Sequence, residues 1–423
     1  MIPKALLNTV IVDQSKELGS VREYVGRNML PLAISYSGSS ALVVKGVRRC
    51  GKSTLLKQLI NTKFTGDFIY FNFDDERISN FKAEDFQTLM EALIGVFGDK
   101  KNVFFDEIQN VEGWELFVNR LLRQGYRVFI TGSNANLLSR ELGTHMTGRH
   151  VDIELYPFSF LEFIRARGID IPKNGLYSTE QRARLSSEFE EYMEKGGMPE
   201  VVVYSNEAVL TQLVNDIIQK DILSRYNVRK PNELKAVIKF LIANASNEIT
   251  YRSIAKNFAV RSPDTVEKYV SYASEAYLTF EIRRFEKKLR KIDKNPRKIY
   301  CVDTGIITKN TPNFFEKKGA ILENIAAVQM KRLGHEFYYY RNTNGHEVDF
   351  VIPSKKEAIQ VCYEFNNENR SRELRGMESA KRCSNASKFT ILTIDQELDI
   401  KHENMNVKIM PMWRWLLESE PAA

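Results

Sequence analysis

Short apolar runs alternate with amphipathic helical patterns through the first part of the chain. Four β-rich runs lie at residues 41–45, 67–73, 102–105 and 127–130. Between the last two runs, one helix face is predicted by apolar residues at i, i+3, i+4, i+7 and i+8, namely Trp114, Phe117, Val118, Leu121 and Leu122. Strands that alternate with helices are typical of a parallel sheet, so residues 35–155 are predicted to form an α/β core.

Beyond Phe158 the pattern becomes mainly helical and then returns to mixed α/β. Helices are predicted at residues 158–166, 188–195 and 208–225, and three short helices followed by a strand at 232–285. Residues 281–298 read as a polar, basic connector. A helix at 319–333 and strands at 338–341, 348–352 and 358–363 then predict a second, smaller α/β unit.

Composition and charge are those of an ordinary globular protein. The 423 residues are 43% hydrophobic and 27% charged, which excludes a disordered or fibrous chain and suggests two or three domains of about 150 residues. Lys and Arg number 61 against 54 Asp and Glu, a formal charge of +7 that permits a polyanionic partner without requiring one.

The four cysteines, Cys50, Cys301, Cys362 and Cys383, are far apart and form no CxxC pair. Neither a disulfide framework nor a zinc ribbon is therefore predicted. The N-terminal segment lacks a cleavable apolar core, and no apolar run approaches the ~18 residues of a membrane helix. We expect a reduced, cytoplasmic protein without a membrane partner.

A phosphate-binding loop is the strongest motif. Residues 46–53 (GVRRCGKS) match the P-loop (Walker A) pattern G-x-x-x-x-G-K-[ST], after a predicted strand and before a predicted helix at 54–61. Gly46 and Gly51 let the backbone wrap phosphates, and the helix N-terminus favours anions. Lys52 is predicted to contact the β- and γ-phosphates, and the Ser53 hydroxyl to hold Mg²⁺.

A pair of carboxylates ends the predicted strand at 102–105. Asp106 is predicted to hold Mg²⁺ and Glu107 to orient and deprotonate the attacking water, a pairing that suits hydrolysis. An apolar strand ending in two acids is common by itself, and the upstream loop makes it informative. ATP and Mg²⁺ are therefore the predicted substrate and cofactor.

Several neighbouring residues are candidates with open alternatives. Thr131–Asn134 could reach the γ-phosphate or the water, or form a polar turn whose Ser133 or Asn134 caps a helix. Arg149 is a candidate transition-state cation or a structural ion-pair partner. The remaining cofactor-site positions are Val47, Arg48, Arg49, Cys50 and Thr54. Either arginine could contact phosphate or a neighbouring subunit, or be solvated, and Cys50 either fills space or is open to oxidation.

The segments GVRRCGKSTLL, FFDEIQNVEGWE, TGSNANLLS and GRHVDIELYPFSFLEF together resemble bacterial and archaeal AAA-type ATPases with a C-terminal domain of unknown function. The resemblance covers nearly the whole chain. It implies an α/β fold with a P-loop NTPase parallel-sheet core, a helical lid, a winged-helix module and a small restriction-endonuclease-like domain. The corresponding ranges are 1–160, 161–230, 231–290 and 291–423. It also implies that Ser133 or Asn134 is a sensor and Arg149 a conformational or trans-acting arginine.

The predicted helix-turn-helix around Ser262, the cap of its second helix, gives little support for DNA binding. The exposed face of that helix presents Asp264, Glu267 and Glu275 against Lys268, which opposes phosphate contact and favours a packing role. The basic connector at 283–298 is a candidate contact for a nucleic-acid backbone, or a solvated face.

The C-terminal unit resembles a metal-dependent nuclease with a degenerate motif. Glu323 and Asp349 occupy positions of E…D…(D/E)-x-K, but Gln360 replaces the second acid and Cys362 the lysine. Glu364 lies on the same predicted strand face and is a candidate substitute. An inactive domain retained for binding or scaffolding is the favoured interpretation.

The sequence thus predicts an Mg²⁺-dependent ATPase whose nucleotide state repositions the C-terminal modules. An ATP-gated DNA-binding regulator and an ATP-licensed nuclease are the alternatives. A protein partner and an oligomer are compatible with all three.

Overall fold

The computed structural model describes residues 1–19, 24–133, 148–172, 175–286, 295–312 and 317–420. The chain divides into two compact units, residues 1–156 and 157–422. Among the described helices, none combines the length and apolar character needed to span a bilayer.

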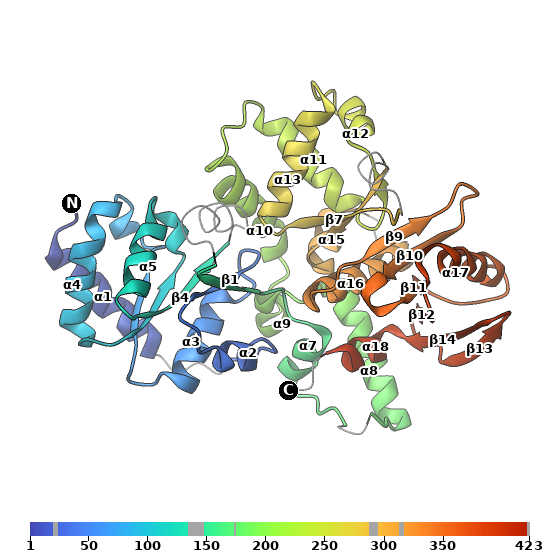
Figure 1. The fold of residues 1–423 in the computed structure, drawn as a ribbon, viewed down its shortest axis with the longest axis horizontal. Helices are drawn as coiled ribbons and strands as arrows, with labels where there is room; N and C mark the ends of the chain where they lie inside the picture. The colour runs from blue at the N-terminus through green and yellow to red at the C-terminus, as the bar shows by residue number, and fades with distance from the viewer. Residues whose placement is uncertain (20–23, 134–147, 173–174, 287–294, 313–316, 421–423) are drawn as a thin grey trace. The chain divides into compact units, whose positions relative to one another are not determined.

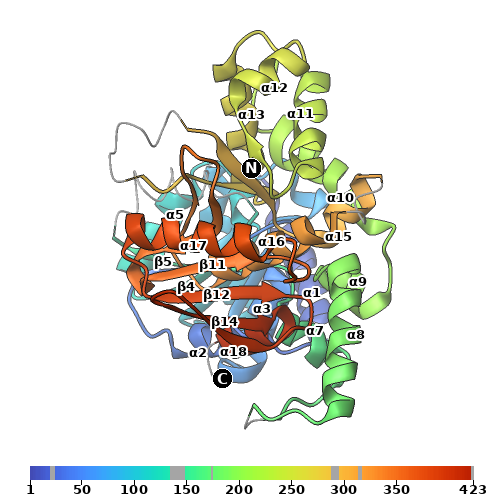
Figure 2. The same cartoon turned by 90° about the vertical axis from the view of Figure 1, so that its right-hand side faces the viewer.

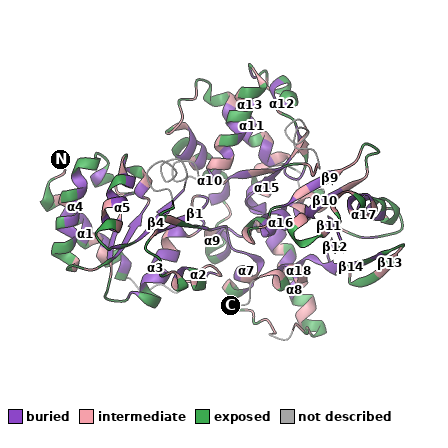
Figure 3. Cartoon of the chain, in the orientation of Figure 1, coloured by how far each residue is buried: buried purple, intermediate pink, exposed green. Residues whose placement is uncertain are grey.

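The first unit contains a five-stranded parallel sheet with strand order β2-β3-β4-β1-β5. Strands β1 and β4 of this sheet are labelled in Figure 1. Its strands are β1 (Ala41–Lys45), β2 (Ile69–Asn72), β3 (Asn102–Asp106), β4 (Arg127–Gly132) and β5 (His150–Glu154). The predicted parallel α/β core is confirmed. The interior strands β1 and β3 are buried along their whole length, which is why they read as continuous apolar runs. Figure 3 colours the buried residues of the chain purple.

Helices cover both faces of this sheet. One core contains β residues such as Val43 and Phe105 and the apolar faces of α1 (Lys4–Gly19), α4 (Phe86–Phe97) and α5 (Trp114–Arg123). On the other face, Phe104 and Phe129 stack with ring centroids 4.5 Å apart, and Phe64 packs against both. Phe64 directly follows α3 (Lys52–Lys63), which contacts α2 (Leu30–Ser35). The short helices are η1 (Glu76–Ile78), η2 (Ala83–Asp85) and η3 (Ile108–Asn110).

The second unit begins with helices. These are α7 (Phe160–Ala166), α8 (Thr179–Lys195), α9 (Pro199–Tyr204), α10 (Val209–Asp216) and the π-helix η4 (Ile217–Leu223). α8 starts well before the predicted residue 188 because Ser178 and Gln181 form a capping box, in which each side chain accepts a backbone N–H of the other. The predicted helix at 208–225 is present, but its second half has π geometry.

A three-helix cluster and a small sheet follow. The elements are α11 (Pro231–Ala243), β6 (Glu248–Ile249), α12 (Tyr251–Asn257), α13 (Pro263–Glu275), β7 (Thr279–Ile282) and β8 (Arg297–Cys301). The three strands form an antiparallel sheet in the order β6-β8-β7. Ser262 caps α13 by accepting the Thr265 N–H, as its sequence predicted. The winged-helix identity of this region stays a prediction.

The chain ends in a six-stranded mixed sheet with strand order β13-β14-β12-β11-β10-β9. Its elements are α15 (Thr304–Asn310), α16 (Lys318–Arg332), β9 (Tyr338–Arg341), β10 (Glu347–Ile352), η6 (Pro353–Lys355), β11 (Glu357–Val361), α17 (Arg370–Ser384), β12 (Lys388–Thr393), β13 (Leu398–His402), β14 (Met405–Pro411) and α18 (Met412–Ser419). Helix α17 lies on one face of this sheet, as Figure 2 shows. Its buried residues Leu374 and Met377 belong to the hydrophobic core there. The predicted helix and three strands are confirmed within a few residues.

Gly376 gives a test of the packing between α17 and β10. A Cβ at this position would lie 2.1 Å from the Glu347 carbonyl oxygen. Gly376→Ala should therefore lower the free energy of unfolding of the second unit by about 1–3 kcal/mol, measured by thermal or denaturant unfolding. Gly319→Ala is the matched control, because Gly319 lies in α16 of the same unit and a Cβ there would meet no atom within 4 Å. Equal stabilities of the two variants would contradict this packing.

Candidate functional site

The parallel sheet of the first unit collects the predicted site at one edge. β1 ends at Lys45, β3 at Asp106 and β4 at Gly132, and Lys45 pairs with Gly132. The loop after β1, the acid pair after β3 and the polar residues at the end of β4 therefore meet where parallel strands present their carboxyl ends.

The loop at 46–53 has the backbone of an anion cradle. Gly46, Arg49 and Gly51 have positive φ angles of 153°, 66° and 99°. A Cβ at Gly46 would lie 2.0 Å from the Leu155 carbonyl oxygen, so only glycine fits there. Lys52 begins α3 and is buried, and its Nζ donates to the carbonyl oxygens of Gly46 and Val47, each at 3.2 Å. The lysine thus lies folded against the loop that it would serve.

Asp106 is a buried carboxylate surrounded by hydroxyl donors. Thr131 donates to its Oδ1, Tyr70 donates to its Oδ2 at 3.2 Å, and the Ser53 side chain also hydrogen bonds to it. Burial raises the pKa of Asp106, and so does the neighbouring Glu107 carboxylate, while the Thr131 and Ser53 hydrogen bonds lower it. The hydroxyl of Ser53 and the carboxylate of Asp106 are therefore adjacent.

Glu107 adopts a left-handed backbone conformation, with φ of 51°. Such a conformation costs about 1–3 kcal/mol in a non-glycine residue and is concentrated at functional sites. Here the Glu107 N–H donates to Thr131 Oγ1 at 2.9 Å, which fixes the strained turn. The Glu107 carboxylate lies 3.7 Å from Lys52 Nζ and accepts a hydrogen bond from the Gln109 amide.

A buried arginine also holds the backbone of the loop through hydrogen bonds. Arg27 donates to the carbonyl oxygens of Cys50 and Tyr156, both at 2.7 Å. Cys50 is fully buried, and burial raises the pKa of its thiol, which disfavours the oxidation-sensitive role and favours the packing role. The backbone of the loop is thereby tied to the last residue of the first unit.

The other candidate residues differ in where they lie. Ser133 is buried directly after β4, whereas Asn134 lies outside the described residues. Arg149 is exposed and precedes β5, whose His150 pairs with Ala41 at the start of β1. Within one chain it therefore lies at the opposite end of the strands from Lys52. Its conformational and trans-acting roles both stay predictions.

The donor set fits Mg²⁺ bound together with a nucleotide. Ser53 and Asp106 supply the hard oxygen ligands that this ion prefers, and it usually completes its shell with water and phosphate oxygens. Among the described residues, no group of three or more His, Cys, Asp or Glu side chains is arranged to hold a metal by itself. Gln109 Oε1 is buried without a hydrogen-bond partner in the described part of the chain, an orphaned polar atom beside Glu107.

Sequence reasoning missed Arg27, Tyr70 and Gln109. Arg27 and Tyr70 reach the site from distant positions and carry no local motif. The sequence contains one clue to Gln109, which is its position two residues after Glu107. A turn at this spacing brings its amide to the Glu107 carboxylate.

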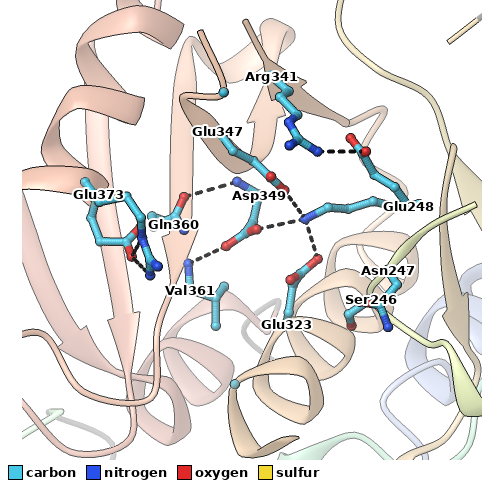
Figure 4. A pocket seen from close by; sticks show the side chains of 14 residues that line it. Ser246, Asn247, Glu248, Glu323, Arg341, Glu347, Asp349, Gln360, Val361 and Glu373 are labelled. Carbon is cyan, nitrogen blue, oxygen red and sulfur yellow. Dashed lines mark hydrogen bonds and ion pairs between the residues drawn. The ribbon is translucent and has the colours of Figure 1, made fainter. Parts of the chain in front are cut away.

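The nuclease-like residues also converge, within the second unit. Glu323, Asp349 and Gln360 line one pocket of about 530 Å³, shown in Figure 4. Gln360 Oε1 accepts the Asp349 N–H at 3.2 Å, and burial raises the pKa of the Cys362 thiol to about 12. Glu364 does not substitute for the lost acid, because β11 ends at Val361 and Glu364 is exposed.

The basic connector is partly used inside the fold. Residues 287–294 lie outside the described residues. Arg297 pairs with Glu281 at 3.0 Å, and Lys298 is buried among carboxylates, so neither is available to a nucleic-acid backbone. Contact with nucleic acid through the remainder of 283–298 stays a prediction.

Comparison with known families agrees with this geometry. Residues 38–164 match a family described as an AAA domain, and residues 186–314 and 318–415 match two domains of unknown function, DUF8612 and DUF4143. The P-loop, the parallel sheet and the AAA match together define an AAA-type P-loop ATPase, and they support nucleotide binding and hydrolysis.

The chain belongs to the family of the uncharacterized protein MJ1544 of Methanocaldococcus jannaschii, with 33% identity over 99% of this chain and 96% of that protein. An uncharacterized protein of Haemophilus influenzae is 32% identical over 76% of this chain and 82% of its own length.

Similar solved structures include AMPPCP-bound DnaA from Aquifex aeolicus and an S. cerevisiae Hsp104–ADP complex. The first has 16% identity and a TM-score of 0.26, and covers 60% of this chain and 90% of that one. The second has 14% identity and a TM-score of 0.32, and covers 78% of this chain and 47% of that one. Superposition this weak carries no inference about function.

Thr131 provides a test of the hydroxyl shell around Asp106. Thr131→Val removes the donor to Asp106 and the acceptor of the Glu107 N–H, so the free energy of unfolding of the first unit should fall by about 1–3 kcal/mol at neutral pH. Thr131→Ser, which keeps the hydroxyl, should lose much less. Chemical denaturation of both variants measures the difference.

The loss of stability caused by Thr131→Val should depend on pH in one direction. The folded-state pKa of Asp106 is already raised above its ordinary value of 3.8, and loss of the Thr131 donor raises it further. The loss of unfolding free energy in Thr131→Val is then complete above the raised pKa of Asp106 in the variant. It becomes smaller as the pH falls toward 3.8, because Asp106 is protonated there. A deficit that grows on acidification would contradict the described contact.

Proposed function

We propose that this protein is an Mg²⁺-dependent ATPase whose nucleotide state repositions the modules that follow Tyr156. The observation that carries the proposal is the P-loop cradle at 46–53, with Asp106 hydrogen bonded to Ser53 and Glu107 lying 3.7 Å from Lys52. ATP binding and hydrolysis follow from the class of protein, and the switch is the finer inference.

Each residue of the site has a proposed role. Backbone N–H groups of residues 46–54 and the N-terminus of α3 bind the phosphates, and Lys52 leaves the loop carbonyls to neutralise the β- and γ-phosphates. Ser53 and Asp106 would hold Mg²⁺, which supplies charge neutralisation on the phosphate oxygens. Glu107 orients the attacking water and accepts its proton, while Gln109 holds the carboxylate. Ser133, directly after β4, or Asn134 is the proposed sensor.

The coupling to the rest of the chain runs through Arg27. Phosphate binding acts on the backbone of the loop, and Arg27 joins that backbone at Cys50 to the carbonyl of Tyr156. Gly46 packs directly against the Leu155 carbonyl in the same segment. A shift of the loop on nucleotide binding or hydrolysis is therefore transmitted to the residues that lead into the second unit, because close-packed atoms cannot move independently of their neighbours.

Two substitutions separate binding from hydrolysis. Glu107→Gln should bind ATP as tightly as the wild type but hydrolyse it about 10²–10⁴ times more slowly, since the amide cannot accept a proton. Lys52→Ala should instead lose tight ATP binding. Fluorescent-nucleotide titration and a steady-state phosphate-release assay measure the two properties, and undiminished turnover in Glu107→Gln would refute its role.

The coupling is tested by Arg27→Ala. Hydrogen–deuterium exchange of residues 157–204 should differ between the nucleotide-free protein and the protein bound to a non-hydrolysable ATP analogue, and this difference should be strongly reduced in Arg27→Ala. The control is Arg123→Ala, an exposed arginine of α5 in the same unit. If exchange in the wild type is insensitive to nucleotide, the switch is wrong, and if Arg27→Ala responds like Arg123→Ala, the route through Arg27 is wrong.

A further inference from the structure

A buried lysine occupies the centre of the pocket in the second unit. Lys298 is 3% exposed, and its Nζ lies 2.7 Å from Glu347, 2.9 Å from Asp349 and 3.0 Å from Glu323 (Figure 4). The three carboxylates come from two elements, α16 and β10, whereas the lysine comes from β8. Three acids thus converge on a single cation that belongs to the chain.

The oxygens around Lys298 have further internal donors. Asp349 Oδ1 accepts from Lys298, and its Oδ2 accepts from the Val361 N–H at 3.0 Å. Glu323 Oε1 accepts both from Lys298 and from the Tyr300 hydroxyl, the latter at 2.6 Å. Both oxygens of Asp349 are therefore engaged by protein groups.

Burial and the neighbouring Asp349 carboxylate raise the pKa of Glu323, and a positive charge between convergent carboxylates relieves their repulsion. A divalent cation such as Mg²⁺ or Ca²⁺ fills such a position by binding carboxylate oxygens at about 2.0–2.6 Å. In this chain the ammonium group of Lys298 lies at that position, at ordinary ion-pair distance from the three acids. It supplies one positive charge and does not need the fixed ligand geometry of a metal ion.

We propose that Lys298 is the resident cation of this carboxylate centre, so that the C-terminal domain excludes a divalent metal and does not cleave phosphodiesters by metal-assisted chemistry. The uncharged Gln360 and the buried thiol of Cys362, at the positions where the nuclease-like motif would carry an acid and a lysine, accord with this assignment, since a centre neutralised from β8 needs neither group. The proposal does not depend on the ATPase function of the first unit.

Alternation along β8 explains how the lysine reaches the centre. Lys298 and Tyr300 lie on one face of the strand and both contact Glu323, while Arg297 lies on the other face and contacts Tyr251 and Glu281. Burial alone would lower the pKa of Lys298, but Asp349 and Glu323 raise it well above its ordinary value, so the ammonium stays charged.

The same ion pairs join the small sheet to the six-stranded sheet. Lys298 of β8 binds Glu347 and Asp349 of β10, and Arg341 of β9 binds Glu248 of β6 at 2.9 Å. The centre therefore joins the two sheets of the second unit through ion pairs.

The test is Mn²⁺ binding by the full-length, nucleotide-free protein, followed by isothermal titration calorimetry and by the EPR signal of free Mn²⁺. Lys298→Ala, which removes the ammonium and leaves room, should gain a Mn²⁺ site that the wild type lacks. Combining it with Glu323→Gln should abolish the gained site. Lys298→Arg, which keeps a positive charge, should gain none.

Stability gives a second measurement. Lys298→Ala should melt several degrees below the wild type in EDTA and recover part of the loss in Mn²⁺, whereas the wild type should melt at the same temperature in both. A folded Lys298→Ala protein that gains no Mn²⁺ site would overturn the proposal.

The wild type supplies a readout that does not depend on how the variant folds. Glu323→Gln should bind as many Mn²⁺ ions as the wild type, because no metal is held at this centre. If the Glu323→Gln substitution instead removes a Mn²⁺ site that the wild type has, then metal binds at this centre in the presence of Lys298, and the proposal is wrong.

Discussion

The parallel pairing of β1 with its neighbours β4 and β5 is the constraint on which the first unit depends. Together with the pairing of β3 with β4, it brings the loop at 46–53, the acid pair at 106–107 and Thr131 to one edge of the sheet, although they are far apart in sequence. It also brings the Leu155 carbonyl so close to Gly46 that no side chain fits between them. The geometry of the phosphate site and its attachment to the following segment therefore have a single origin.

Two of the buried lysines in the described part of the chain, Lys52 and Lys298, show how surroundings determine what a lysine can do. Lys52 donates to two neutral carbonyls at 3.2 Å and lies 3.7 Å from Glu107, contacts that an incoming phosphate can replace. Lys298 is held by three carboxylates at 2.7 to 3.0 Å. An ammonium with neutral partners remains available to an anionic ligand, whereas one with a full set of carboxylates is a permanent part of the structure.

Local patterns were sufficient for most strands of the first sheet and for the phosphate loop. Strand β1 was predicted at its observed bounds, and the loop was recognisable because its chemistry requires particular residues at fixed spacing. The C-terminal strands β12 to β14 were not assigned from sequence, and α8 was predicted too short because the capping pair before it was overlooked.

Contacts between distant segments could not be predicted in this way. Lys298 read as part of a basic surface connector, because nothing near it in the sequence shows the acids that it meets at positions 323, 347 and 349. Arg27 and Tyr70 were missed for the same reason. Glu364 was placed on the wrong surface because β11 ends three residues earlier, and period-two reasoning holds only while a strand continues.

Strand β8 presents a different basic residue to acids on each of its two faces, and this helps to specify its alignment with the neighbouring strands during folding. A slip of one residue against β6 and β7 would turn Arg297 toward the three acids and withdraw both Lys298 and Tyr300 from them. The misaligned strand would withdraw the Tyr300 hydroxyl from Glu323 and leave Glu281 without its arginine. The ion pairs of Arg297 and Lys298 therefore act together with the buried apolar residues Ile299 and Cys301 in specifying the native pairing of this short sheet.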